Sequence, residues 1–401
     1  MSAATVSFDP FSDEFFTSPY ETYRRMRDEA PVYYSDEFDF YALTRHDDVA
    51  AAFKDHETFS SAYGVDLAEV RKGEPTKHGS IIAMDPPAHR RMRSLLNKVF
   101  TPRAIEAHRD LVTRLIDKHL AAVDPDGFDF VQDFSALFPV DIMTTMQGVP
   151  DEDHQQVRLW IDELLHREPG EVDMTEAGKK AGVDMAVYYY QLIKQRRENL
   201  GDDLLSKLIR AEIERDNGEM EPLNNVEITE FAMLLGGAGA ETVTKLLGSA
   251  AVVFAENPDQ WQKLRDDRSK IPLAVEELLR YEAPAQYNVR CTLREIELHA
   301  VTIPAGKPVF LVGGSANRDP QAWTDPDRFD IDRNRTEAQN LGLGYGIHSC
   351  LGAALARMES AVALDRMLDF MPRYEVDRDR CTRVNMQNVA GWRNVPVRLL
   401  R

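Results

Sequence analysis

The sequence predicts one large, mainly α-helical domain with a small β region. Apolar residues recur at helical spacing along most of the chain, whereas strand patterns are few and short. No repeat, low-complexity tract or Gly/Ser-rich linker divides the 401 residues. A chain of this length holds two or three ordinary domains or one large one. The missing linker favours a single domain over residues 1–401.

Four helices follow from periodicity and from end signals. In the first, polar residues separate five positions that recur at spacings near three and four: Ile105, Val112, Leu115, Ile116 and His119. The second begins at Asp202–Leu205, because acidic side chains stabilise the positive end of a helix. A long third helix spans about 228–254 and stops near Pro258, and a fourth ends at Arg280, before Pro284.

Strand patterns are confined to a few short segments. The predicted strands lie at Tyr33, Phe40–Leu43 and Val309–Leu311, where aromatic and β-branched residues cluster. The segment Ile303–Lys307 contains Pro and Gly and predicts a turn that leads into the last of these strands. The sheet is therefore expected to be a minor part of the fold.

Two segments, about 60–83 and about 167–173, follow neither periodicity and predict loops. Both contain glycine and proline among charged residues. Long loops in compact domains often act as lids or binding loops, so both segments are candidate elements for substrate access. The alternative for each is a plain surface loop.

Composition and charge exclude several classes of protein. Apolar residues make up 43% and charged residues 29%, which is typical of a soluble globular protein rather than a disordered or collagen-like one. The formal charge of −19 disfavours binding to nucleic acid, whose phosphates repel an acidic surface. The three cysteines fit no zinc or disulfide pattern and suit a reducing compartment.

No segment predicts a signal peptide or a membrane anchor. The N-terminus reaches Pro10 without an apolar run, and the most apolar stretch is Leu246–Ala255. A membrane-spanning helix needs about 20 apolar residues, so this stretch predicts a buried helix instead. We expect a cytoplasmic protein.

The segment Leu343–Gly352 has the pattern of a metal-binding loop. Gly344 and Gly346 permit a tight turn, and Cys350 stands where a helix is predicted to begin. The N-terminus of a helix stabilises a thiolate, which is a strong ligand for a soft metal. The alternative is a small buried hydrophobic cysteine. The flanking glycines and the helix start favour the ligand.

This segment resembles the haem-ligand signature of the cytochrome P450 family, F-G-x-G-x-H-x-C-x-G, and Leu355–Arg357 matches the Leu-Ala-Arg that follows. The one departure is Leu343 at the usual Phe position, which implies altered packing near the thiolate. The resemblance implies the cytochrome P450 fold and a haem b cofactor, with Cys350 as the axial iron ligand and O2 as co-substrate. It places three glycines against the haem: Gly344, Gly346 and Gly352.

The second motif lies within the long predicted helix. Gly236, Gly237 and Gly239 each weaken a helix interior by about 0.5–1 kcal/mol relative to Ala. Such a cluster marks either a close helix contact or an opening of the hydrogen-bond ladder. Glu241 and Thr242 add a carboxylate and a hydroxyl, which can pass protons into an apolar pocket. The segment resembles the family's A/G-G-x-D/E-T, which implies a catalytic pair for oxygen activation.

The third motif is Glu277 and Arg280, which share one helix face. Taken alone, such a pair is a common surface ion pair that contributes little. It resembles the family's E-x-x-R, a buried structural pair completed by an arginine from a later loop. The segment Pro326–Phe329 fits that loop, which implies Arg328 as the third member.

The fourth group would hold the haem carboxylates, which need cations or donors when they are partly buried. His89 and Arg93 are four residues apart on one predicted helix, within a segment that resembles the family's D-P-P-x-H-x-x-x-R. Arg290 and His348 match the family's other two propionate contacts. The alternative for each residue is a solvated surface charge. The resemblance extends through Ser315–Pro320 and covers nearly the whole chain.

These motifs together predict a haem-thiolate monooxygenase. It would hydroxylate or epoxidise an apolar small molecule such as a lipid, terpenoid or steroid. Electrons would come from NAD(P)H through a separate ferredoxin and ferredoxin reductase, and we expect a monomer. The alternatives are a haem-binding sensor, a partner-recruiting pseudo-enzyme and a peroxide-using variant. The Glu241–Thr242 pair disfavours all three.

The resemblance also predicts a substrate pocket and a docking surface. The pocket residues are Leu234, Leu235, Gly237, Ala238, Tyr287, Asn288, Val289, Val389 and Ala390. This lining is mostly apolar, which disfavours a sugar as substrate. The predicted docking surface for an acidic ferredoxin is a basic patch around the helix of His89 that comprises Arg90, Arg91, Lys98 and Arg103.

Overall fold

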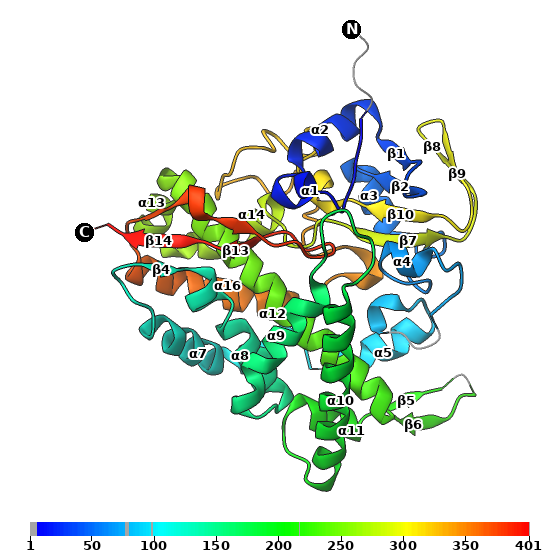
Figure 1. Ribbon diagram of the computed structural model, residues 1–401, viewed down its shortest axis with the longest axis horizontal. Coiled ribbons are helices and arrows are strands. Elements are labelled where there is room, and N and C mark those ends of the chain that lie inside the picture. The colour runs from blue at the N-terminus through cyan, green and yellow to red at the C-terminus, as the bar shows by residue number, and fades with distance from the viewer. Residues whose placement is uncertain (1–5, 77–79, 98, 216, 401) are drawn as a thin grey trace.

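The structure, a computed structural model, describes residues 6–76, 80–97, 99–215 and 217–400. Helices fill most of the molecule, and the strands gather mainly beside the N-terminal helices (Figure 1). This arrangement confirms the predicted mainly α class with a small β region.

A single long helix, α12 (Asn225–Glu256), runs through the middle of the molecule (Figure 1). Its neighbours are α8 (Phe138–Gln147), α9 (His154–Leu165), α10 (Glu176–Glu198) and α16 (Ala353–Phe370). Because helices cover it on several sides, most of its side chains are buried over its second half. Among the described residues α12 alone is long and apolar enough to cross a membrane, but 78% of its most apolar window is buried within the protein.

The predicted helix ends agree with the observed caps. Asp203 accepts a hydrogen bond from the backbone N–H of Ser206 at 2.8 Å and begins α11 (Leu204–Arg210). Asn224 and Glu227 form a capping box that starts α12 three residues earlier than predicted. The fourth predicted helix is α14 (Ile271–Tyr281), which ends one residue after Arg280.

The predicted helix around 105–119 is wrong as one element. It is divided into α6 (Pro102–Glu106) and α7 (Arg109–Ala121), and the chain leaves the helical conformation at His108. Ile105 and Val112 lie on opposite sides of this break, yet both are buried in the same core. Apolar spacing therefore continues across the break and cannot reveal it.

The main sheet has five strands in the order β1-β2-β10-β7-β3. They are β1 (Val32–Ser35), β2 (Phe40–Leu43), β10 (Pro308–Leu311), β7 (Asn288–Thr292) and β3 (Phe59–Ser60). Only the β2–β10 pair is parallel. All three predicted strands belong to this sheet. The predicted turn before β10 is also present, and Gly306 adopts a φ of 79° in it.

The remaining elements are short. The helices are α1 (Asp13–Thr17), α2 (Tyr20–Glu29), α3 (His46–Lys54), α4 (Leu67–Val70), α5 (Ala88–Asn97), α13 (Pro258–Asp266) and α15 (Gly313–Ala316). The strands are β4 (Phe128–Asp129), β5 (Glu212–Glu214), β6 (Met220–Pro222), β8 (Ile296–Leu298), β9 (Val301–Ile303), β11 (Tyr374–Val376), β12 (Thr382–Arg383), β13 (Trp392–Asn394) and β14 (Pro396–Leu399).

The two predicted loops differ in structure. The segment 60–83 contains α4 and a turn of 3₁₀ helix at Ile81–Ala83, so it is not one continuous loop, and residues 77–79 lie outside the described residues. The segment 167–173 has no helix or strand. Gly170 holds it against the N-terminal segment, because its backbone N–H donates to the carbonyl oxygen of Phe11 at 2.7 Å.

Candidate functional site

The loop before α16 presents Cys350. Gly344 and Gly346 have φ angles of 68° and 70°, which L-residues rarely adopt, and a Cβ on Gly346 would collide with the backbone oxygen of Phe53. The backbone N–H of Cys350 donates to the carbonyl oxygen of Leu343 at 2.8 Å and closes the loop. Both glycines are therefore required by the fold of this loop.

Cys350 differs from the other two cysteines in its surroundings. Cys291 is buried in the core and Cys381 is half-buried, whereas Cys350 keeps accessible surface although protein surrounds it closely. A residue in that position lines a hollow within the protein. Burial raises the pKa of the Cys350 thiol, while the N–H of Gly352 and the nearby Arg93 act in the opposite direction.

Four cationic or hydrogen-donating side chains from α5, β7 and the cysteine loop lie near one another. The ring centres of His89 and His348 are 4.3 Å apart. Neither ring nitrogen of His89 has a hydrogen-bond partner, nor does Nε2 of His348, although all three atoms are buried. Arg290 is 5% exposed and donates to the carbonyl oxygen of Val289, while Arg93 donates to that of Ser349. Within the described part of the chain, neither arginine forms an ion pair with a carboxylate.

The electrostatics of these four residues favour an anionic ligand. Burial, with the neighbouring arginines, lowers the pKa of His89 to about 4 and of His348 to about 3. Burial also lowers the pKa of Arg290 to about 10, because no internal acid pairs with it closely enough to compensate. Orphaned buried donors and unpaired guanidinium groups are what the two propionates of haem require. The residues present therefore fit that cofactor.

One stripe of α12 is accessible although the helix is mostly buried. Its members Leu234, Ala238 and Thr242 are four residues apart, so they share a helix face. The hydroxyl of Thr242 donates to the carbonyl oxygen of Ala238 at 2.8 Å. Leu235 and Glu241 lie off this stripe and are buried. The prediction that Leu235 lines a pocket is therefore wrong.

The glycines of α12 serve close packing. A Cβ on Gly239 would come within 2.5 Å of Met143 on α8, and one on Gly236 within 3.3 Å of the Tyr189 hydroxyl on α10. The helix runs from Asn225 to Glu256 without a break. Of the two alternatives that the sequence left open, the close helix contact is the observed one.

Two predicted pocket residues, one just before β7 and one on it, belong to the core instead. Tyr287 is 3% exposed, with its ring 4.7 Å from that of Phe310, and its hydroxyl donates to the carbonyl oxygen of Gln387. Val289 is fully buried in the same cluster. Side chains alternate along a strand, so these two point away from Asn288, which remains partly accessible. The register of β7 thus contradicts Tyr287 and Val289 as pocket residues.

The remaining predicted pocket residues lie in two segments. Gly237 is partly accessible on α12, and Ala390 is partly accessible in the loop before β13. Its neighbour Val389 is 8% exposed and packs in a small cluster with Val384 and Met386.

The E-x-x-R pair is buried, but its predicted third member is wrong. Arg280 donates to both carboxylate oxygens of Glu277, at 2.7 and 2.9 Å. Arg333, not Arg328, completes the triad, since its Nε lies 3.1 and 3.2 Å from the same two oxygens. The Arg328 side chain is 63% exposed, and only its carbonyl oxygen contacts the triad. The segment 328–335 contains three arginines, and the sequence does not reveal which of them is buried.

A charged cluster beside Glu241 was missed by sequence reasoning. Nζ of Lys245 lies 3.0 Å from Oε2 of Glu241, and both side chains are buried. Asp162 on α9 forms an ion pair with Arg158 at 3.0 Å, while burial and the charge of Glu241 raise the pKa of Asp162 to about 7. The spacing of Glu241 and Lys245, four residues apart on one helix, is the only sequence signal for this cluster.

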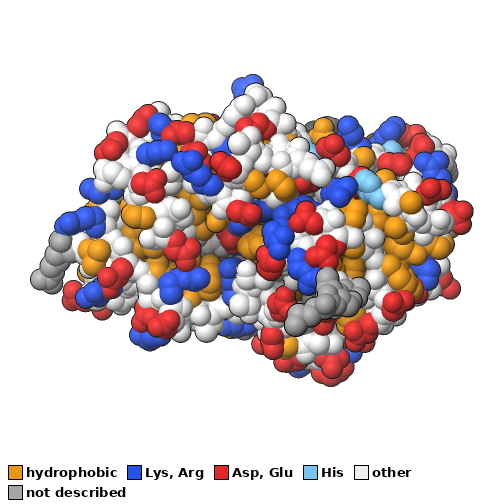
Figure 2. Space-filling view, turned by 90° about the horizontal axis from the view of Figure 1, so that it is seen from above, with side chains coloured by type: hydrophobic (Ala, Val, Ile, Leu, Met, Phe, Trp, Pro, Cys, Tyr) orange, Lys and Arg blue, Asp and Glu red, His pale blue; other side chains and the backbone are white. Residues whose placement is uncertain are grey.

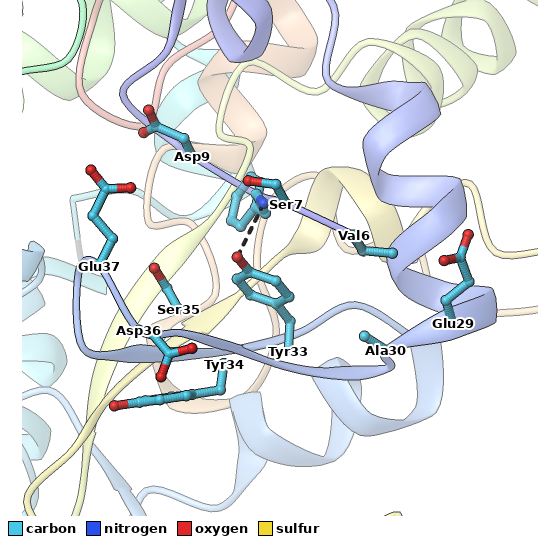
Figure 3. A pocket seen from close by; sticks show the side chains of 11 residues that line it. Val6, Ser7, Asp9, Glu29, Ala30, Tyr33, Tyr34, Ser35, Asp36 and Glu37 are labelled. Atoms are coloured by element: carbon cyan, nitrogen blue, oxygen red, sulfur yellow. Dashed lines mark hydrogen bonds between the residues drawn. The ribbon is translucent and has the colours of Figure 1, made fainter. Parts of the chain in front are cut away.

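A separate hollow of about 480 Å³ lies near the N-terminus, between residues 6–9 and 29–37. Figure 3 shows four carboxylates around it, from Asp9, Glu29, Asp36 and Glu37, and the hydroxyl of Tyr33 accepting the backbone N–H of Phe8 at 3.2 Å. None of the residues in the site described above contributes to it.

Comparison with known proteins gives a full-length match. The family model described as Cytochrome P450 matches residues 15–388. The protein named "Putative cytochrome P450 123" of Mycobacterium tuberculosis (strain ATCC 25618 / H37Rv) is 40% identical over 97% of this chain and 96% of its own length. Erythromycin C-12 hydroxylase of Saccharopolyspora erythraea is 36% identical over 93% and 92%. A solved mutant of P450 EryK in complex with erythromycin B superimposes with a TM-score of 0.87, at 34% identity over 97% of both chains.

Proposed function

This chain belongs to the cytochrome P450 family of monooxygenases and has its fold, and from that premise we propose that it inserts one oxygen atom of O2 into an apolar small molecule. The observation that carries the proposal is the accessible Cys350 on the loop that also bears His348, one of the unpartnered buried donors. When bound, haem b supplies the iron at which dioxygen is reduced and cleaved, and a thiolate ligand favours that cleavage.

The chain's own residues bind and orient this cofactor. Cys350 provides the iron ligand, and Gly344, Gly346 and Gly352 keep the backbone of its loop free of side chains. The four donors described above, His89, Arg93, Arg290 and His348, hold the propionates. Their burial makes each hydrogen bond to a carboxylate worth more than it would be in water.

Protons reach the reacting oxygen through the α12 residues. Thr242 stands on the accessible stripe, and its hydroxyl donates to Ala238 while its lone pairs remain free to accept. Glu241 precedes it, and although burial opposes this, Lys245 and Asp162 hold the pKa of Glu241 below its usual value. Glu241 is therefore a carboxylate that can receive and release a proton next to the hydroxyl.

Replacing Thr242 with Ala is expected to uncouple reductant consumption from product formation. The variant should retain haem and oxidise NAD(P)H, but it should release more peroxide and less product. One proton-transfer group contributes about 10²–10⁴ in rate, so the change should be large. The measurement is the ratio of labelled oxygen in the product, supplied as ¹⁸O2, to NAD(P)H consumed, with purified ferredoxin and reductase.

Thr242→Ser is the matched control, because it keeps the hydroxyl and should restore most of the coupling. An unchanged ratio in Thr242→Ala would contradict the proton role of this residue. A haem sensor or pseudo-enzyme would give no labelled product in the parent protein, and a peroxide-using enzyme would give product without NAD(P)H.

The proposed substrate class follows from the residues that are candidates to line the substrate pocket. The accessible candidates Leu234, Gly237, Ala238 and Ala390 are apolar or small, and Asn288 adds one polar group. Such a surface suits a lipid, terpenoid or steroid-like molecule better than a sugar. Two of the relatives named above point to erythromycins: one is named erythromycin C-12 hydroxylase, and the P450 EryK mutant is solved in complex with erythromycin B. The test records the haem absorption spectrum with a panel of lipids, terpenoids and steroids. A spectral shift on binding identifies the substrate class.

The electron donor in this proposal is a small acidic ferredoxin that docks on the cysteine side of a cytoplasmic, monomeric enzyme. Arg90 and Arg103 are exposed on α5 and α6, Arg91 is half-buried, and Lys98 lies outside the described residues. The net charge is −19, and Figure 2 shows Lys and Arg side chains interspersed with Asp and Glu on the face that it draws. An adjacent groove of about 260 Å³ is lined by Arg109 and Arg357 together with Glu106 and Glu276, which form ion pairs with these two arginines.

Reversing Arg90 and Arg103 to Glu is expected to slow reduction of the haem by the ferredoxin at low salt. Exposed charges act mainly on association rates, and the effect should shrink as salt screens them over about 10 Å at 0.1 M. Stopped-flow reduction across a salt series measures this. Arg265→Glu on α13 is the control for a general charge effect, and equal rates in the double variant and the parent would place docking elsewhere.

A further inference from the structure

A buried carboxylate joins α8 to two neighbouring helices, α7 and the start of α9 (Figure 1). This residue, Asp141 on α8, is 4% exposed. Its Oδ2 accepts a hydrogen bond from Nε2 of His119 on α7 at 2.7 Å and lies 3.4 Å from Nζ of Lys118. Its Oδ1 accepts from the Gln155 amide at 3.1 Å and lies 3.3 Å from Nδ1 of His154, the first residue of α9. The start of α9 is therefore attached to α8 by side chains.

His154 is 4% exposed, and it needs two ring hydrogens to satisfy its surroundings. Its Nδ1 faces the Asp141 carboxylate, and its Nε2 lies 3.1 Å from the carbonyl oxygen of Val149. Both groups only accept hydrogen bonds, whereas a neutral imidazole donates from one nitrogen alone. The geometry therefore favours an imidazolium. The contact of His119 with Asp141 uses only Nε2, so a neutral ring satisfies it.

The neighbouring charges stabilise both ions of the His154–Asp141 pair. Although burial opposes both shifts, hydrogen bonds with His119 and His154 lower the pKa of Asp141 far below its usual value, and contacts with Asp141 and Val149 raise the pKa of His154. Asp151, in the turn of 3₁₀ helix before α9, adds a second carboxylate 3.8 Å from Nε2 of His154.

Other elements around α9 also carry titratable groups. They are Arg114 and Lys118 on α7, Glu152 and Asp153 in the 3₁₀ turn, Arg158 and Asp162 further along α9, Tyr188 on α10, and Glu241 and Lys245 on α12. Several of these have partners of their own: Arg158 pairs with Asp162, Glu241 pairs with Lys245, and the Tyr188 hydroxyl donates to Asp153. The groups placed directly against the His154 ring are the two carboxylates and the Val149 carbonyl.

We propose that His154 is a pH-sensitive switch whose imidazolium attaches the start of α9 to α8 and whose deprotonation releases that end of the helix. A hollow of about 460 Å³ is lined in part by Asp141 and His154 and gives the proton a path to solvent. On release, the N–H bond at Nδ1 breaks and water takes the proton. No electrons move.

The switch is connected to the substrate side of the protein through α9 itself. This helix ends at Leu165 and leads into the segment 167–173, which the sequence predicts as an access element. At that end, the backbone N–H of Arg167 donates to the carbonyl oxygen of Asn385, and that of Gln387 donates to Leu165. Release of the first end therefore leaves α9 attached mainly at the second, next to the access segment. This connection to substrate access rests on the function proposed above.

The pH range of the switch follows from the direction of the pKa shift. The pKa of His154 is raised above its ordinary value of 6.5, so the attachment is complete below that value and is lost as pH rises through the raised pKa. The pKa of Asp141 is lowered, so this carboxylate stays ionised over the whole range. Loosening of α9 at alkaline pH is therefore assigned to His154.

The test measures amide hydrogen exchange of the haem-loaded protein from about pH 6 to about pH 9, corrected for the intrinsic pH dependence of exchange. In the parent, α9 and the segment 167–173 should open about tenfold more often at the higher pH, because one charge-assisted hydrogen bond is lost. His154→Gln should open readily at every pH. His119→Gln keeps one donor and should behave as the parent does, and His299→Gln, between β8 and β9, should change nothing.

A second readout assigns the proton directly. Titration of ¹³C-labelled histidine rings by NMR should give His154 a pKa above 6.5, and Asp141→Asn should lower it. A pKa at or below 6.5 would overturn the proposal, as would a pH dependence of α9 opening that survives in His154→Gln. Opening of α9 without the segment 167–173 would overturn the connection to access. Neither readout requires turnover, so a parent that forms no product would contradict the proposed function and leave the switch to be decided by these measurements.

Discussion

Replacing Cys350 with His is expected to abolish the thiolate-type absorption band of the ferrous carbon-monoxide complex and to reduce monooxygenation to background. Histidine can still ligate iron, so haem binding should persist, but an imidazole does not donate electrons as a thiolate does. The loss should therefore appear in chemistry rather than in cofactor content. The measurement combines the ferrous carbon-monoxide difference spectrum with haem content per chain and product formation.

Cys291→Ala and Cys381→Ser are the matched controls, because neither cysteine stands in a glycine loop before a helix. Cys291 is buried with its thiol directed to the carbonyl oxygen of Thr292, and Cys381 contacts the carbonyl oxygen of Asp377. Both variants should keep the thiolate-type band. If that band survives in Cys350→His, another residue ligates the iron and the assignment fails.

The parts of the site that sequence could predict are local in the chain. The loop from Leu343 to Gly352 is specified within ten residues, because two left-handed positions demand glycine wherever the loop packs. Helix starts at Asp203 and Asn224 were also predictable within a turn or so, since a cap bonds to the residues that follow it. Such features need no knowledge of the rest of the fold.

The parts that sequence could not predict depend on distant contacts. Tyr287 and Val289 enter the core because of the register of β7 against β10, which a short strand pattern does not specify. Asp162 interacts with Glu241, which lies 79 positions further along the chain, only because α9 packs on α12. The third member of the buried triad could not be predicted either, because it depends on which arginine the fold buries.

Replacing Arg333 with Ala is expected to destabilise the protein strongly, whereas Arg328→Ala should leave its stability near that of the parent. Arg333 is 6% exposed, contacts Glu277, and donates to the carbonyl oxygens of Asp325 and Arg328. Removing one partner of a buried ion pair costs about 3–5 kcal/mol, and Arg280 remains to neutralise Glu277, so we expect about 3 kcal/mol. Folded proteins retain only about 5–15 kcal/mol in total, so this loss is large.

Arg328 provides a control of the same residue type, five positions away. Its side chain is 63% exposed and lies 3.8 Å from Asp330, an exposed pair of the kind that contributes about 0–1 kcal/mol. Midpoints of urea unfolding and rates of haem loss at 37 °C should therefore separate the two variants. The triad ties α14 to the segment before the cysteine loop, through the bonds of Arg280 to the carbonyl oxygens of Asn317 and Pro326. Arg333→Ala should consequently lose haem faster than Arg328→Ala. The opposite order would indicate that Arg328, and not Arg333, is the third member of the triad.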